Sequence, residues 1–212
     1  MRLWWLRAEL VALFVGVPVI LFFYATRWNV HVTLWLFALY SLYFLMRTPE
    51  FSWRTLWQGL GWPMRQRQIA LLRFIALAPV IVAFTYYLLP ERLFRFPIDR
   101  PGFWIVVMVL YPLLSVAPQE LVFRSFFFSR YKDLLSDRIL MMTSNALIFG
   151  FSHIMLHNWI APLFCAIGGL LFAHSYSQHR SLKWAIIEHA LYGNFLFTAG
   201  LGWYFFVHAP PT

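Results

Sequence analysis

The chain is poor in cysteine and in charged residues. Cys165 is its only cysteine, which excludes an internal disulfide and a metal cluster held by several thiolates. Only 12% of the 212 residues are charged, whereas soluble domains carry about 25%. Hydrophobic residues reach 61%, which is more than a soluble fold of this length could bury. The composition therefore predicts a membrane protein.

Acidic residues are scarce, with eight Asp and Glu against 17 Lys and Arg, for a formal net charge of +9. Such an excess also occurs in nucleic-acid-binding proteins, where the basic residues gather on one face. Here they lie between long apolar runs, where they would meet anionic lipid headgroups. We therefore expect membrane lipid, and no nucleic acid, as a partner.

Seven apolar runs are long enough to cross a bilayer, which takes about 20 helical residues. They are residues 9–27, 29–47, 69–89, 103–124, 138–157, 159–177 and 182–207. We predict an all-α polytopic bundle of about seven transmembrane helices that forms a single membrane domain over residues 1–212. Residues 48–68 mix tryptophan with arginine, which is typical of a segment that lies in the headgroup layer.

The basic residues fall unevenly on the two sides of such a bundle. All but Arg27, Arg92, Arg95 and Arg100 lie on or near the side of the N-terminus. The positive-inside rule then predicts that the N-terminus is cytoplasmic and the C-terminus is outside.

One acid and one arginine lie together at the end of the fourth run. Glu120 and Arg124 are four residues apart, so they share one face of a helix. An ionised acid at the bilayer centre costs about 2.5–3.5 kcal/mol, so it is normally paired or functional. The pair is open to two readings, a structural ion pair that closes a helix end or part of an active site.

Histidines provide the other polar groups within the runs. His153 and His157 end the fifth run, and His189 lies beside Glu188 in the seventh. These residues could simply sit at headgroup level. An acid and histidines from separate helices could instead converge around a water, where the carboxylate accepts a proton and neutral histidine holds the water, binds a metal or stabilises an oxyanion. A proton-coupled transporter would use the same residue types.

Three short motifs follow one another along the chain. They are Gln119-Glu120-x-x-x-Arg124, Phe149-x-x-x-His153 and His189-x-x-x-Gly193-Asn194. They resemble the motifs of the CPBP intramembrane protease family, also called the CAAX protease and bacteriocin-processing or Abi family. These motifs are Glu-Glu-x-x-x-Arg, Phe-x-x-x-His and His-x-x-x-Asn, the last with Asn or a small residue at its end. The family's eukaryotic relatives are the Rce1-type CAAX prenyl endopeptidases. The resemblance covers residues 110–199.

This resemblance implies a helical membrane endopeptidase with a catalytic water in a cavity open to the bilayer. Its substrate would be a prenylated or transmembrane peptide, and its location the bacterial inner (cytoplasmic) membrane. In the family the first Glu activates water, the histidines position it, and the third motif helps hold the oxyanion. The corresponding catalytic residues are Glu120, His153, His189, Gln119, Arg124 and Asn194. Glu120, His153 and His189 could alternatively hold Zn²⁺ or another divalent metal.

Two positions depart from the family pattern. Gln119 replaces the first Glu, and an amide cannot accept a proton from water at neutral pH. Gly193 replaces the usual Asn, and Asn194 is rotated about 100° around the helix. We favour an active enzyme in which Glu120 takes the role of the base, because so many polar groups are retained in lipid.

Two other functions remain open. A catalytically impaired family member could act as a membrane peptide-binding, lipid-binding or immunity protein. A transporter with a proton relay through Glu120, Glu188 and His189 is less favoured, because the sequence lacks the repeated halves usual for such proteins.

Overall fold

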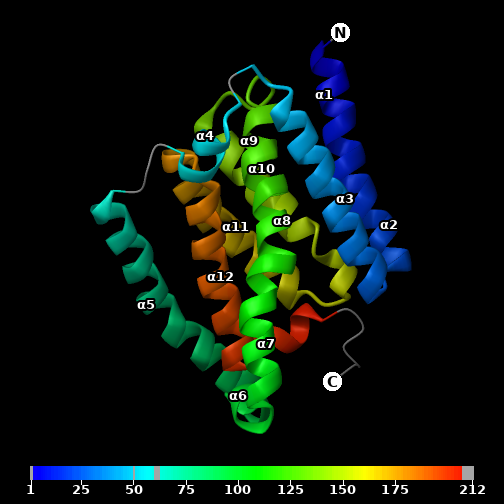
Figure 1. Cartoon of the computed structure of the whole chain (residues 1–212). Helices are drawn as coiled ribbons and strands as arrows, with labels where there is room; N and C mark the ends of the chain where they lie inside the picture. Colours follow the sequence, from blue (N-terminus) through cyan, green and yellow to red (C-terminus); the bar gives the residue numbers. More distant parts are fainter. Residues whose placement is uncertain (1, 50, 60–62, 207–212) are drawn as a thin grey trace.

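The computed structural model describes residues 2–49, 51–59 and 63–206, and every regular element in these ranges is helical (Figure 1). The prediction of an all-α polytopic bundle is therefore confirmed. The N-terminal half contains α1 (Arg2–Val11), α2 (Val17–Tyr24), α3 (Arg27–Met46), α4 (Trp53–Gln58) and α5 (Met64–Leu88). The C-terminal half contains α6 (Arg95–Asp99), α7 (Pro101–Tyr111), α8 (Ala117–Glu120), α9 (Phe127–Arg130), α10 (Arg138–Phe151), α11 (Ile160–His179) and α12 (Leu182–Ala199).

Shorter helical segments join several of these elements. Residues Ala12–Gly16, Pro112–Val116 and Leu121–Phe126 are π-helical, and residues Pro90–Arg92, Ile154–Leu156 and Leu201–Phe205 form 3₁₀ turns. Two of the π segments join α7, α8 and α9 into one helix from Pro101 to Arg130.

Six helices in the described residues are long and apolar enough to cross a membrane, one fewer than predicted. They are Leu3–Tyr24, Trp28–Met46, Met64–Leu88, Pro101–Arg130, Arg138–Leu156 and Ile160–His179. The seventh predicted run, 182–207, forms α12 and a 3₁₀ turn instead of one long helix, and residue 207 lies outside the described residues. Helix α12 carries Lys183, Glu188 and His189, and it ends at Gly200, whose φ is 107°. A side chain at Gly200 would also collide with the carbonyl oxygen of Arg92.

The predicted headgroup segment at residues 48–68 is not one continuous helix. Its described part contains α4 and the start of α5, and the N-terminus of α4 is capped by Ser52, whose hydroxyl accepts a hydrogen bond from the Thr55 amide. Gly59 ends α4 with a φ of 56°, a conformation that favours glycine. Residues 64–68 already belong to α5, and residues 60–62 lie outside the described residues.

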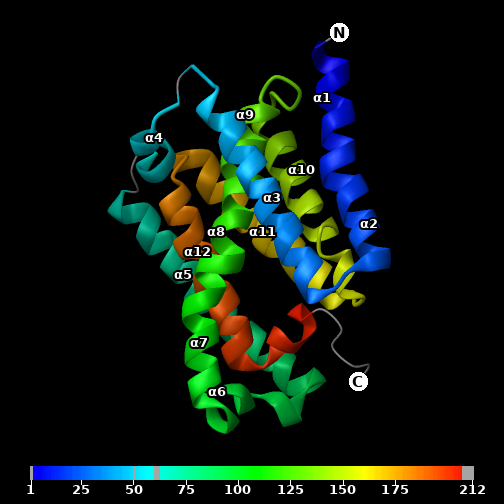
Figure 2. The same ribbon diagram turned by 45° about the vertical axis from the view of Figure 1, so that its right-hand side comes forward.

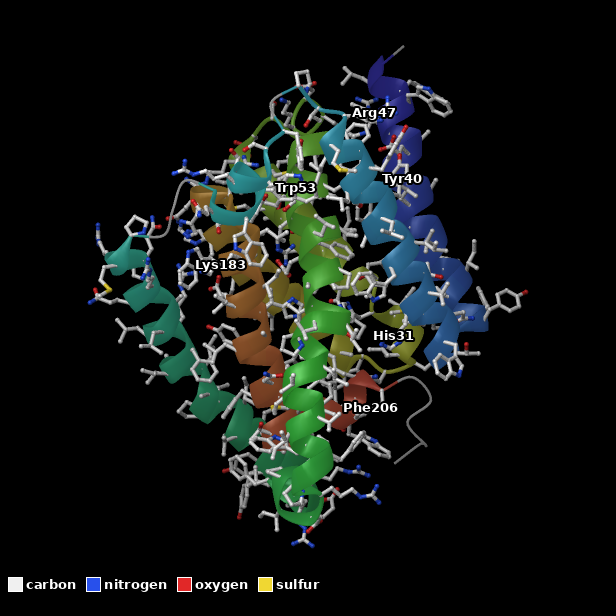
Figure 3. All side chains as sticks on the ribbon, in the orientation of Figure 1. His31, Tyr40, Arg47, Trp53, Lys183 and Phe206 are labelled. Atoms are coloured by element: carbon white, nitrogen blue, oxygen red, sulfur yellow. The ribbon has the colours of Figure 1, made fainter. Side chains whose placement is uncertain are left out.

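The connections alternate between the two ends of the bundle (Figures 1 and 2). The N-terminal end of α1, helix α4, the α9–α10 connection and the α11–α12 connection lie at the upper end, and α6 and the C-terminal turn lie lower. Arg47, Trp53 and Lys183 are correspondingly in the upper half (Figure 3). This arrangement is the one that the predicted order of the spans requires.

Aromatic side chains pack together where the first and second spans meet the end of the Pro101–Arg130 helix. The ring of Phe14 contacts those of Phe37, Phe123, Phe127 and Tyr131, with centroids 5.1–6.0 Å apart. Such edge-on contacts add to the stabilisation from burial. The cluster packs the first and second spans against the end of the Pro101–Arg130 helix.

An ion pair closes the same contact. The Arg130 guanidinium donates hydrogen bonds to both carboxylate oxygens of Glu9, at 2.8 Å from Nε and 2.5 Å from the second nitrogen. The Tyr131 hydroxyl donates a third hydrogen bond to Glu9, and the Arg130 guanidinium lies over the Phe44 ring. The first, second and fourth spans are thus held together at one end.

Candidate active site

The Gln119-Glu120 pair lies between two π-helical segments of the fourth span. Such segments shift the direction of the side chains that follow and are frequent at functional sites. Pro118 has no amide hydrogen to donate to the Leu114 carbonyl, so this carbonyl accepts a hydrogen bond from the Trp35 indole at 3.1 Å instead. Helix α3, through Trp35, therefore helps to fix the helical turn that carries Gln119 and Glu120.

Glu120 is fully buried and bridges two helices. Its Oε2 lies 3.1 Å from Arg124 Nε, and its Oε1 lies 2.8 Å from Nδ1 of His189 on α12. The side chains of Glu120 and Arg124 are 0% exposed and that of His189 is 8% exposed. The predicted shared face is thus observed, and both carboxylate oxygens have a charged or polar neighbour.

Asn145 on α10 extends this cluster. Its side-chain oxygen accepts a hydrogen bond from the Arg124 guanidinium, and its Nδ2 donates to the Phe123 carbonyl at 2.6 Å. The guanidinium also faces the rings of Phe149 and Phe172. The sequence analysis missed Asn145, although an amide within an apolar run was a usable signal.

His189 is held on several sides. The Glu120 carboxylate can only accept a hydrogen bond, so Nδ1 is the donor and the neutral ring presents the lone pair of Nε2. The Tyr111 hydroxyl lies 3.3 Å from this Nε2. The ring stacks on Phe172 with centroids 4.8 Å apart, which leaves it little freedom to turn.

His153 follows the C-terminal end of α10 and is held in a similar manner. Its Nδ1 donates to the Phe149 carbonyl at 2.8 Å, so the neutral ring leaves its Nε2 as an acceptor. The Phe149 ring contacts both imidazoles, with centroids 5.0 Å from His153 and 5.6 Å from His189. His157, in contrast, packs on the Phe22 ring.

A cavity of about 670 Å³ adjoins these groups. Its wall is mostly apolar and comes from the first five spans, α11 and α12, with His31 and Phe206 marking its position in the lower half of the bundle (Figure 3). Polar side chains on the wall near the motifs are Tyr111, Ser115, Gln119, Ser152, His153 and His189. A cavity of this size and polarity can hold an extended apolar ligand.

The six predicted catalytic residues divide into two groups. Gln119, His153 and His189 line the cavity, and the side-chain oxygen of Gln119 is buried without a hydrogen-bond partner among the described residues.

Glu120, Arg124 and Asn194 are not among the described residues that line the cavity. Glu120 lies between Arg124 and His189. Asn194 donates a hydrogen bond to the Met108 carbonyl on α7 at 3.1 Å. The amide of Gln119, rather than the carboxylate of Glu120, therefore faces the cavity.

The predicted metal ligands do not form a metal site. No three His, Cys, Asp or Glu residues within the described ranges are placed to share an ion. Nδ1 of His189 is directed at Glu120, and the second oxygen of Glu120 faces Arg124. The set Glu120, His153 and His189 therefore does not fit Zn²⁺, and no step of the chemistry is assigned to a metal.

Tyr111 was missed by the sequence analysis. It lies eight residues before the first motif, in an otherwise apolar run, and only the structure brings its hydroxyl to His189. Gly193 was an indirect sign of such a residue. A glycine in place of the usual side chain leaves space that another side chain can fill.

Comparison with known proteins supports the motif assignment. Residues 101–195 match the family model described as type II CAAX prenyl endopeptidase, Rce1-like. No curated protein and no solved structure matches the chain. The matched region begins with α7, ends within α12 and contains Glu120, His153 and His189, and it confirms the suspected family resemblance over those residues. It supports a membrane protease of that superfamily.

Proposed function

From the match of residues 101–195 to the Rce1-like CAAX endopeptidases, we propose that the protein is an intramembrane endopeptidase in which His189 activates water. One observation carries the proposal: the 2.8 Å contact between Glu120 and His189 Nδ1, beside the cavity that His189 lines. A carboxylate that orients an imidazole and stabilises its protonated form is the arrangement that makes histidine an effective general base in hydrolases.

In the proposed reaction, the water oxygen attacks the scissile carbonyl carbon while Nε2 of His189 takes a proton from the water. The tetrahedral intermediate then collapses, the C–N bond breaks, and His189 gives the proton to the leaving nitrogen. Nε2 of His153 can accept the second hydrogen of the water and so position it. The Gln119 amide can donate a hydrogen bond to the substrate.

This assignment changes the role expected for Glu120. The sequence analysis made Glu120 itself the base, in compensation for Gln119. Its contacts with Arg124 and His189 favour a positioning role instead, because both oxygens are engaged away from the cavity. Gln119 then need not accept a proton.

The mostly apolar cavity wall supports an apolar substrate, either a prenylated peptide or the end of a transmembrane peptide. The excess of arginine and lysine on the side of the N-terminus supports a cytoplasmic N-terminus. The membrane that we propose is the bacterial inner membrane.

The test is cleavage of a membrane peptide library, including prenylated peptides, by protein reconstituted in liposomes, with products identified by mass spectrometry. In serine proteases, an isosteric change of the orienting carboxylate lowers kcat by about 10⁴. We expect His189→Gln to abolish cleavage and Glu120→Gln to lower kcat by at least about 100-fold. His157→Gln is the control and should cleave normally. Equal cleavage by the wild type and His189→Gln would refute the proposal.

A second function is favoured by a different observation. The cavity presents the Gln119 amide where the family motif has an acid, so the protein could bind a peptide or lipid without cleaving it. In that case Gln119→Glu changes the affinity for a membrane peptide and creates no turnover. Turnover that appears only in Gln119→Glu would identify the wild type as a binder with a latent site. Turnover in the wild type would exclude the binding function.

A further inference from the structure

We infer that Tyr111 is a further catalytic residue, whose hydroxyl donates a hydrogen bond to the oxyanion from the space that a side chain at position 193 would occupy. This inference rests on the proposed function. It assigns a role to a residue outside the three motifs.

The first observation is steric. Gly193 lies one turn after His189 on α12, so both positions face the same way. A Cβ at Gly193 would overlap the phenol of Tyr111, and it would lie 2.7 Å from the Tyr111 Cζ atom. A side chain at position 193 and the ring of Tyr111 therefore exclude each other.

The second observation is the direction of the phenol. Its oxygen lies 3.3 Å from Nε2 of His189, the atom proposed to receive the proton, and Tyr111 lines the cavity. The ring packs edge-on against Phe197 with centroids 5.0 Å apart, which fixes the phenol at this place.

The third observation concerns Asn194, the residue that the motif alone would choose as the donor. Its Nδ2 already donates to the Met108 carbonyl, and it is not among the described residues that line the cavity. Other cavity residues that can donate a hydrogen bond include Ser115, Gln119, Ser152 and Tyr192. Of these donors and Tyr111, it is the Tyr111 hydroxyl that the described contacts place beside Nε2 of His189.

The chemistry needs no further reactant. At rest the Tyr111 hydroxyl can donate to Nε2 of His189. When a substrate binds, the Tyr111 O–H turns to the scissile carbonyl oxygen, which frees the single lone pair of Nε2 to take the proton from water. The phenol keeps its proton throughout and stabilises the charge by a hydrogen bond alone.

The principal test is Tyr111→Phe in reconstituted protein. This variant keeps the ring that fills the space beside Gly193, so its melting temperature should stay close to that of the wild type. Loss of one oxyanion donor typically lowers kcat by about 10²–10³-fold, and we expect a fall in this range with little change in KM.

The matched control is Tyr176→Phe, which removes the hydroxyl of another buried tyrosine whose partner is Ser125, and it should keep normal kcat. A purely structural role for Tyr111 predicts normal kcat in Tyr111→Phe and would overturn the inference.

An exchange of the side chains at positions 111 and 193 tests, independently of catalysis, whether the two side chains compete for the same space. Gly193→Asn should lower the melting temperature when Tyr111 is present, and it should be tolerated when combined with Tyr111→Ala. The double variant should also recover at least about tenfold of the kcat lost in Tyr111→Ala, because the new amide can donate in place of the phenol. Two outcomes would refute the idea that Tyr111 takes the place of a side chain at position 193. One is that Gly193→Asn lowers the melting temperature equally with and without Tyr111, and the other is that the double variant recovers no kcat.

The outcomes separate this inference from the function on which it rests. A wild type that cleaves no membrane peptide refutes the endopeptidase and with it the catalytic role of Tyr111. Cleavage that depends on His189 and is unchanged in Tyr111→Phe refutes only the role of Tyr111.

Discussion

The two halves of the bundle differ in how their space is used. In the upper half, around α9 (Figure 1), the rings of Phe127 and Tyr131 are fully buried, whereas the lower half contains a cavity of about 670 Å³ with a mostly apolar wall. Phe14, Phe37 and Phe123 belong to the same aromatic cluster and also line the cavity. Glu120 lies between the buried Arg124 and the cavity-lining His189, at the boundary of the two regions, and the π-helical segments lie on either side of Glu120. Close packing surrounds the polar cluster on one side, while the cavity reaches His189 on the other.

The largest effect is expected from removing the acid at this boundary. Glu120→Ala leaves the Arg124 guanidinium buried without its carboxylate, and breaking a buried pair in this way costs about 3–5 kcal/mol. Unfolding in detergent, followed by circular dichroism or tryptophan fluorescence, measures the loss. The control is Glu91→Ala, which breaks the partly exposed pair with Arg92 and should change stability by less than about 1 kcal/mol. Similar losses in the two variants would contradict the assigned importance of the cluster.

Truncation of an apolar side chain should cost more stability in the filled half than beside the cavity. Phe127→Ala opens a void in the filled half, where such changes cost about 3–5 kcal/mol. Leu110→Ala enlarges a cavity that already exists, and Leu110 is 43% exposed, so we expect less than about 1.5 kcal/mol. Denaturant titration of both variants in the same detergent compares them. The contrast would disappear if both variants lost the same stability.

Asn145 should have an intermediate effect. Asn145→Ala leaves the Phe123 carbonyl and one Arg124 nitrogen without their partner, at a cost of about 1–3 kcal/mol. Because Arg124 contacts Glu120 and Glu120 orients His189, kcat should also fall. Asn158→Ala removes an amide that bonds the Tyr204 carbonyl far from this cluster, and it should lower stability without changing kcat per folded molecule.

Filling the hollow half should change binding more than stability. Leu163 is 44% exposed and lines the cavity, so Leu163→Trp can extend into free space with less than about 1 kcal/mol of destabilisation. We expect KM for an apolar peptide to rise several-fold, measured in liposomes. Ile139→Trp is the matched control, because Ile139 is 67% exposed and is not among the residues that line the cavity. An unchanged KM in Leu163→Trp would place the substrate elsewhere.

The sequence was sufficient for six of the seven predicted spans and for the Glu120–Arg124 pair. Apolar runs of about 20 residues predict membrane spans because only a helix satisfies its own backbone in lipid. The four-residue spacing of Glu120 and Arg124 predicts their contact, which the 3.1 Å distance agrees with.

The direction of neighbouring side chains could not be predicted in the same way. Regular α-helical spacing takes no account of the π segments that flank Gln119 and Glu120, and these segments decide which of the two faces the cavity. The contact between Tyr111 and His189 joins residues 78 positions apart, so no local pattern contains it. The early end of α12 depends on Gly200 approaching the Arg92 backbone, which is also a long-range contact.

The bond between Glu9 and Arg130 has a consequence for how the chain can be divided. Glu9 precedes the family-matched residues 101–195 by a long stretch, yet its carboxylate holds the arginine that ends the matched helix at the upper end of the bundle. A truncated protein that started at Pro101 would lose this carboxylate together with the rings of Phe14 and Phe37, and it would leave Phe126, Phe127 and Arg130 uncovered. The recognisable motifs all lie after residue 100, yet we expect them to need the first 100 residues in order to fold.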